Sequence, residues 1–272
     1  MSRIATKFAA LKAQGRGALI PFLEAFDPDR ETAMAILRGM PAAGADLIEI
    51  GVPFTDPMAD GPTVQKAGQR GLKAGATLGG ALGMVTEFRE ADAETPIILM
   101  GYFNPILSYG VAKFCADAAE AGVDGLIVVD VPPEEADELA PDATANGLDL
   151  IRLVAPTTGD ERLPKVLSAT TGFVYYVAIT GITGTRSAST DDLAAAIPRI
   201  RKFTDLPIAI GFGVRSPQQA GEASRIADGA VVASALIEGL LASLDAEGRA
   251  TSATVPAVLD RVRELAEAVR GG

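Results

Sequence analysis

The 272-residue chain contains no histidine, no tryptophan and only one cysteine, Cys115. Without imidazole it can form neither a Ser-His catalytic triad nor a zinc site with histidine ligands. A single thiol can form neither an internal disulfide nor a thiolate metal cluster. These absences favour a reducing, cytoplasmic setting and chemistry that needs no bound metal.

Positive charge and long apolar runs are also scarce. The chain has 24 Lys and Arg residues against 35 Asp and Glu residues, and its net charge of −11 repels nucleic acid and anionic lipid. The most apolar stretch, residues 229–242, is interrupted by Glu238, so it falls short of the roughly 18 apolar residues of a membrane span. The N-terminal segment lacks the apolar core of a signal peptide. We therefore expect a cytoplasmic protein that binds neither nucleic acid nor membrane.

Eight short runs of aliphatic and β-branched residues recur along the chain, beginning at residues 18, 46, 96, 125, 149, 172, 206 and 229. Segments with helical spacing lie between them, and the runs are apolar almost throughout, as strands covered on both faces must be. This alternation predicts one α/β domain over residues 1–272, a single (β/α)8 TIM barrel, whose usual size is about 250 residues. A doubly wound open sheet is the alternative.

Two additions to a regular barrel are expected. The first 17 residues read as an amphipathic helix with Ile4, Phe8 and Leu11 on one face. The second and third runs begin 50 residues apart, whereas the other intervals are 23 to 34 residues, so a long loop is predicted after the second strand.

A carboxylate interrupts the apolar second strand. Alternation places Glu49 on the face opposite Ile48 and Ile50, so Glu49 points into the barrel mouth if these isoleucines pack on helices. Desolvation there raises a carboxyl pKa toward the range of a general acid and base, although a buried glutamate with a structural partner is the alternative. Asp56 and Asp60 follow in the long loop, where aspartate beside proline or glycine is also ordinary turn chemistry.

The ends of the last two predicted strands are typical of a phosphate site. The seventh strand ends in Gly211-Phe212-Gly213, and we expect Ser234 to cap a short helix after the eighth. Glycine amides and a helix N-terminus can hold a phosphate without a cationic side chain, and barrels commonly place one here. Ordinary loop glycines and caps are the alternative.

Two further features narrow the chemistry. The polar, glycine-containing segment 178–190 is predicted to be a mobile lid, with a plain solvated loop as the alternative. None of the eight candidate strands contains lysine, which excludes a Schiff-base aldolase built on a strand lysine. Carboxylate acid-base chemistry on a phosphorylated substrate remains.

Six motifs together resemble the tryptophan synthase alpha chain family over essentially the whole chain: ALIPFLEA (18–25), IEIGVPFTDPMADGPTVQ (48–65), ILMGYFNPI (98–106), VVDVPPEE (128–135), FVYYVAITGITGTR (173–186) and GFGV (211–214). The resemblance implies a (β/α)8 barrel that cleaves indole-3-glycerol phosphate to indole and glyceraldehyde 3-phosphate. It implies no cofactor in this chain. It further implies that indole passes to a pyridoxal-phosphate-dependent tryptophan synthase beta chain in an alpha2-beta2 heterotetramer.

The resemblance also implies roles for individual residues. Glu49 corresponds to the family's acid-base catalyst and Asp60 to the residue that assists it. The phosphate and lid positions correspond to Thr183, Gly184, Gly213, Ala233 and Ser234, and the indole pocket to Phe22, Met100, Tyr175 and Phe212.

The chain departs from the family pattern in two places. It has Glu24-Ala25-Phe26-Asp27-Pro28 where the family commonly has Thr-Ala-Gly-Asp-Pro, and phenylalanine is strained if that glycine has positive φ. Ala233 stands where glycine often precedes the serine. Two other functions remain open: another phosphosugar enzyme, such as an isomerase, or a catalytically weak barrel that activates a beta chain.

Overall fold

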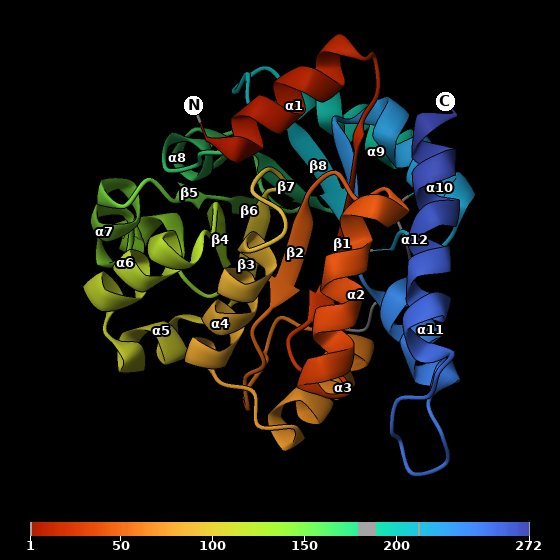
Figure 1. Ribbon diagram of the computed structural model, residues 1–272. Coiled ribbons are helices and arrows are strands. Elements are labelled where there is room, and N and C mark those ends of the chain that lie inside the picture. Colours follow the sequence, from red (N-terminus) through yellow and green to blue (C-terminus); the bar gives the residue numbers. More distant parts are fainter. Residues whose placement is uncertain (1, 179–188, 212, 272) are drawn as a thin grey trace.

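The computed structural model describes residues 2–178, 189–211 and 213–271 (Figure 1). Its strands are β1 (Ala18–Glu24), β2 (Ile48–Gly51), β3 (Ile97–Gly101), β4 (Gly125–Val128), β5 (Asp149–Leu150), β6 (Arg152–Val154), β7 (Val174–Val177), β8 (Ile208–Gly211) and β9 (Gly229–Val232). Its helices are α1 (Arg3–Ala13), α2 (Arg30–Ala43), α3 (Pro62–Lys73), α4 (Leu78–Arg89), α5 (Phe103–Tyr109), α6 (Val111–Ala121), the 3-10 helix η1 (Pro133–Glu138), α7 (Ala140–Ala145), α8 (Leu163–Ser168), α9 (Thr190–Ile200), α10 (Pro217–Ile226), α11 (Ser234–Ser243) and α12 (Thr254–Arg270).

All strand pairs in the described residues are parallel, in the order β5-β4-β3-β2-β1-β9-β8-β7-β6. Only Ile151 separates the two outer strands, β5 and β6, so they are the two halves of one strand and bring the sheet round into a barrel. The predicted (β/α)8 barrel is confirmed, with its fifth strand divided into two pieces.

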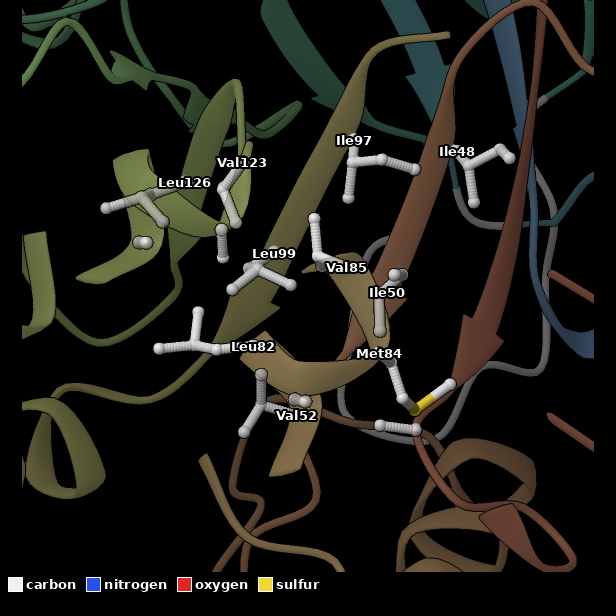
Figure 2. Close-up of a cluster of buried hydrophobic side chains, with 14 of the residues drawn as sticks. Ile48, Ile50, Val52, Leu82, Met84, Val85, Ile97, Leu99, Val123 and Leu126 are labelled. Carbon is white, nitrogen blue, oxygen red and sulfur yellow. The ribbon is translucent and has the colours of Figure 1, made fainter. Parts of the chain in front are cut away.

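The outer face of the barrel strands packs against the helices. Ile48 and Ile50 lie in this outer core, as the alternation predicted. Figure 2 shows Ile50 and Leu99 beside Val85 of α4. Burial of these side chains stabilises the barrel by roughly 1.5–3 kcal/mol for each large aliphatic residue.

A second layer of side chains fills the barrel itself. Leu47 belongs to this inner core, on the face opposite its neighbour Ile48. The amphipathic N-terminal helix is confirmed as α1, and Ile4, Phe8 and Leu11 are buried in the same inner core. In Figure 1, α1 lies across the end at which the strands begin. The opposite end, where the strand arrows finish, is left for the loops that carry the candidate site.

The long second interval contains more than a loop. Residues 52–61 are irregular, and the additional helix α3 precedes α4. Pro62 begins α3 at the first helical position, where its missing N–H is not needed.

The loop after β1 contains an aromatic residue in the left-handed region of backbone conformation. Phe26 has φ of +65°, and it is the one residue other than glycine with positive φ in the part of the chain that the structure describes. Position 26 therefore has the positive φ that was considered for the glycine of the family pattern. A β-carbon on Gly80 of α4 would lie 2.9 Å from Cζ of Phe26, so the ring packs against α4 where no side chain intervenes.

The cap of α11 differs from the prediction. Ala233 is the N-cap and Ser234 the first helical residue, and no side chain bonds to the first amides of the helix. The expectation that Ser234 caps α11 is wrong, because the helix begins one residue earlier than a serine cap requires. None of the described helices is both long and apolar enough to cross a membrane.

Candidate active site

Glu49 lies on β2 inside the barrel and is 1% exposed. Both of its carboxyl oxygens are buried without a hydrogen-bond partner. Desolvation, and secondly the charge of Asp60, raise the pKa of Glu49 to about 8. At neutral pH Glu49 therefore carries a proton that it can donate and later recover.

Asp60 lies in the loop after β2 and is held by contacts with α3 and with Tyr102, the residue that follows β3. The amide side chain of Gln65 donates to the backbone oxygen of Asp60 at 2.9 Å. The hydroxyl of Tyr102 accepts a hydrogen bond from the N–H of Ala59 at 3.0 Å and donates one to the Asp60 carboxylate. Burial raises the pKa of Asp60 to about 6, and the bond from Tyr102 opposes that rise. Asp60 is therefore the more acidic of the two carboxyl groups, Glu49 and Asp60.

An apolar wall adjoins Glu49. Phe22, Met100 and Tyr175 are buried in the inner core, and Phe22 lies opposite Glu49 in the register of β1 and β2. Burial raises the pKa of the Tyr175 phenol, and the nearby charge of Glu49 raises it further. A β-carbon on Gly211 would lie 2.1 Å from the Tyr175 hydroxyl, so glycine is required where the phenol crosses β8. The wall can accept a flat aromatic ring beside an acid.

The predicted phosphate residues that can be placed lie after neighbouring strands. Gly213 follows β8 with φ of +96°, and Ala233 and Ser234 follow β9, which pairs with β8. Both Ala233 and Ser234 are partly exposed. Arg215 is exposed and forms an ion pair with Glu238 at 3.2 Å, so its charge is already paired.

Three of the predicted site residues, Thr183, Gly184 and Phe212, lie outside the described residues, as does nearly all of the predicted lid. Asp56 lies in the same loop as Asp60 but is exposed, and it accepts a hydrogen bond from the hydroxyl of Thr55.

Sequence reasoning missed two polar residues at this end of the barrel. Tyr102 gave no sequence signal, since its role depends on the loop from β2 reaching β3. Glu24 carries the same sequence signal as Glu49, since each is a carboxylate in an apolar strand. Glu24 is 5% exposed. Within the described residues no group of three or more Asp, Glu, Cys or His side chains is arranged to hold a metal ion.

Comparison with known proteins decides the family. The family model described as tryptophan synthase alpha chain matches residues 8–269. The chain belongs to this family.

Relatives within the family match along almost the whole chain. The tryptophan synthase alpha chain of Granulibacter bethesdensis is 68% identical over 270 residues, covering 99% of this chain and 97% of that one. That of Gluconacetobacter diazotrophicus is 67% identical, covering 99% and 98% of the two chains.

Solved structures agree. The tryptophan synthase alpha subunit of Legionella pneumophila has a TM-score of 0.91 at 35% identity and covers 100% of both chains. A structure of tryptophan synthase from M. tuberculosis in an aminoacrylate-bound form has a TM-score of 0.86 at 33% identity, covering 99% of this chain and 100% of that one.

Family membership gives the reaction class. Tryptophan synthase alpha chains are carbon-carbon lyases of tryptophan biosynthesis that cleave indole-3-glycerol phosphate to indole and glyceraldehyde 3-phosphate, and this chain is such an enzyme. The family also implies a beta-chain partner. A sugar isomerase and a catalytically weak activating subunit are not favoured.

Proposed function

We propose that Glu49 and Asp60 are the groups that cleave indole-3-glycerol phosphate. The observation that carries the proposal is the unpartnered, buried carboxyl group of Glu49 beside an apolar wall, with a more acidic aspartate nearby. A buried ionisable group without a partner is costly to the fold, and such groups cluster at active sites.

The chemistry follows from the two protonation states. Glu49 donates its proton to the ring carbon that bears the glycerol chain, and positive charge develops on the ring nitrogen. Asp60 accepts a hydrogen bond from the ring N–H and stabilises that charge. Glu49, now a carboxylate, takes the proton of the neighbouring chain hydroxyl; the carbon-carbon bond breaks, the aldehyde forms, and the electron pair returns to the ring. One proton thus moves from hydroxyl to ring carbon through Glu49.

The remaining site residues bind the substrate in this proposal. Phe22, Met100, Tyr175 and Phe212 take the indole ring. Backbone amides at Gly184, Gly213 and Ala233, with Ser234, take the phosphate, supported by the adjacent ends of β8 and β9. Thr183 belongs to the lid that covers the substrate.

We further propose that the whole chain acts as one domain, without a cofactor of its own, in the cytoplasm. Its partner is a tryptophan synthase beta chain that holds pyridoxal phosphate, in an alpha2-beta2 heterotetramer. The net charge of −11 supports the absence of a nucleic-acid or anionic-membrane partner.

The test is indole release from indole-3-glycerol phosphate by the Glu49→Gln variant in the presence of the beta chain. The amide keeps the shape of the side chain but cannot cycle a proton, so we expect a loss of at least ~10²–10⁴-fold in kcat. Binding of a glycerol phosphate analogue should be nearly unchanged. Turnover above about a tenth of the unmodified rate, far outside that range, would refute the assignment.

A further inference from the structure

The segment that carries Asp60 is only weakly anchored by packing. Residues 54–60 precede α3, and each of their side chains is partly or fully exposed, up to 77% for Met58. Segments with few buried contacts are the first parts of a protein to open. A catalytic carboxylate, however, must be held within about 0.5 Å of its productive position. Contacts other than apolar burial must therefore hold this segment.

Tyr102, the residue after β3, holds one side of the segment. Its side chain is 5% exposed, and its hydroxyl accepts a hydrogen bond from the N–H of Ala59 at 3.0 Å. The same hydroxyl donates to the carboxylate of Asp60. The ring of Tyr102 also packs on that of Phe54, with 5.3 Å between the ring centroids. Tyr102 thus contacts both the beginning and the end of the segment.

Gln65, in the first turn of α3, holds the other side. Its side-chain amide donates to the backbone oxygen of Asp60 at 2.9 Å and, more weakly, to that of Pro57 at 3.5 Å. These two residues are the ends of one turn, in which the N–H of Asp60 donates to the backbone oxygen of Pro57 at 3.1 Å. Gln65 therefore bridges both ends of the turn that presents the Asp60 carboxylate.

Within the described residues, Tyr102 and Gln65 are the two side chains outside the segment 54–60 that hydrogen-bond to it. They belong to different elements and contact the consecutive residues Ala59 and Asp60. Together they restrict both the backbone of Asp60 and its carboxylate.

We propose that Tyr102 and Gln65 are positioning residues that clamp the segment 54–60 from two sides and hold the Asp60 carboxylate toward the ring nitrogen of the substrate. Tyr102 acts on the carboxylate and on the neighbouring amide, whereas Gln65 acts on the backbone of the turn. This inference rests on the role of Asp60 proposed above.

Two variants remove one side of the clamp each. Tyr102→Phe keeps the ring against Phe54 but lacks the hydroxyl, and it should lower kcat by roughly 10- to 100-fold, the range for losing a hydrogen bond to a charged group. Gln65→Met keeps the length of the side chain without a donor and should lower kcat by roughly 2- to 10-fold, the range for neutral hydrogen bonds. KM should change little in both. The variants are assayed as full chains with the beta chain present, and their thermal midpoints show that they fold.

Each variant has a matched control. Tyr109→Phe removes a hydroxyl that donates to Asp117 on α6 at 2.6 Å, and Gln69→Met changes an exposed glutamine of α3. Both controls should keep the kcat of the unmodified chain. A Tyr102→Phe variant as active as Tyr109→Phe, or a Gln65→Met variant as active as Gln69→Met, would overturn the clamp.

The pH profile distinguishes positioning of the carboxylate from a general structural role. The titratable groups that face Asp60 are Glu24 on β1, Glu49 on β2 and Tyr102. The bond from Tyr102 lowers the pKa of Asp60, which is about 6. Tyr102→Phe should therefore move the acid limb of kcat/KM to higher pH by roughly one unit. Gln65→Met should leave the limb in place, because Gln65 bonds to the backbone. An unmoved limb in Tyr102→Phe would refute the contact with the carboxylate.

Double variants test whether the clamp acts through Asp60. Asp60→Ala removes the carboxylate that is positioned, so in that background neither Tyr102→Phe nor Gln65→Met should lower kcat further. A full additional loss in the double variants would refute positioning through Asp60. Asp60→Ala alone reports on the proposed function: full activity of that variant would show that the role of Asp60 is wrong, whatever the results at Tyr102 and Gln65.

Discussion

Replacing Glu49, the proposed catalytic acid, should stabilise the protein while it abolishes the reaction. The pKa of Glu49 is about 8 in the folded chain, against 4.5 for an ordinary glutamate. The folded state therefore keeps a proton that the unfolded chain releases between these two values. The contribution of Glu49 to the free energy of unfolding is fully present below pH 4.5 and is lost as the pH rises toward 8.

The magnitude follows from that interval. Each pH unit above 4.5 removes about 1.4 kcal/mol, so at pH 7 ionisation of the unfolded chain costs the native state about 3 kcal/mol. Glu49→Gln does not titrate and occupies the same volume. It should be more stable than the unmodified chain by about 3 kcal/mol at pH 7, and equally stable near pH 4.5.

Thermal unfolding at the two pH values measures this difference. At roughly 2 °C per kcal/mol for a chain of this size, the midpoint should rise by about 6 °C at pH 7. The matched control is Glu267→Gln, which changes an exposed glutamate on α12 and should give the same midpoint as the unmodified chain at both pH values. A Glu49→Gln midpoint no higher than that of the unmodified chain at pH 7 would refute the argument that Glu49 is buried as an unpartnered acid.

Three further predictions concern glycine packing, phosphate binding and the beta chain. Gly51→Ala places a β-carbon 2.4 Å from both Phe22 Cζ and Glu24 Oε2, so indole release should fall at least about tenfold. The control Gly83→Ala, in open space on α4, should retain activity, and equal activities of the two variants would contradict the close packing at Gly51. Ser234→Asp should weaken glycerol phosphate binding, measured by calorimetry, because it places a negative charge beside the phosphate. Arg215→Ala should have little effect on this binding because Arg215 pairs with Glu238. A strong loss of affinity in Arg215→Ala would show that a salt bridge holds the phosphate. Glycerol phosphate should tighten beta-chain binding by the same factor by which the beta chain tightens glycerol phosphate binding, and an unchanged affinity would exclude coupling through the loops at the barrel mouth.

Much of the barrel could be predicted because its determinants are local. The position of Ile48, Glu49 and Ile50 on alternate faces of β2 follows from the two-residue period of a strand, and the structure has that arrangement. The break at Ile151 could not be predicted, since the run from Asp149 to Ala155 contains neither glycine nor proline to mark an interruption. Only the pairing of its two halves with different neighbours, β4 and β7, divides it.

The cap of α11 shows a local rule overridden by tertiary structure. A serine after a strand is a sound N-cap signal, yet Ala233 takes that position. The helix begins where β9 releases the chain, and the pairing of β9 with β1 and β8 fixes that point.

The sequence by itself determined the chemical inventory: carboxylates without histidine, one cysteine, and eight apolar strands that place Glu49 inside a barrel. Only the tertiary structure decided which carboxyl groups lie near one another and which of them keeps its proton. Asp60 reaches Tyr102 across β2 and β3, and Glu24 lies against Gly51 through the register of β1 and β2. A pKa depends on desolvation and on the distance between charges, and both are set by elements far apart in the chain.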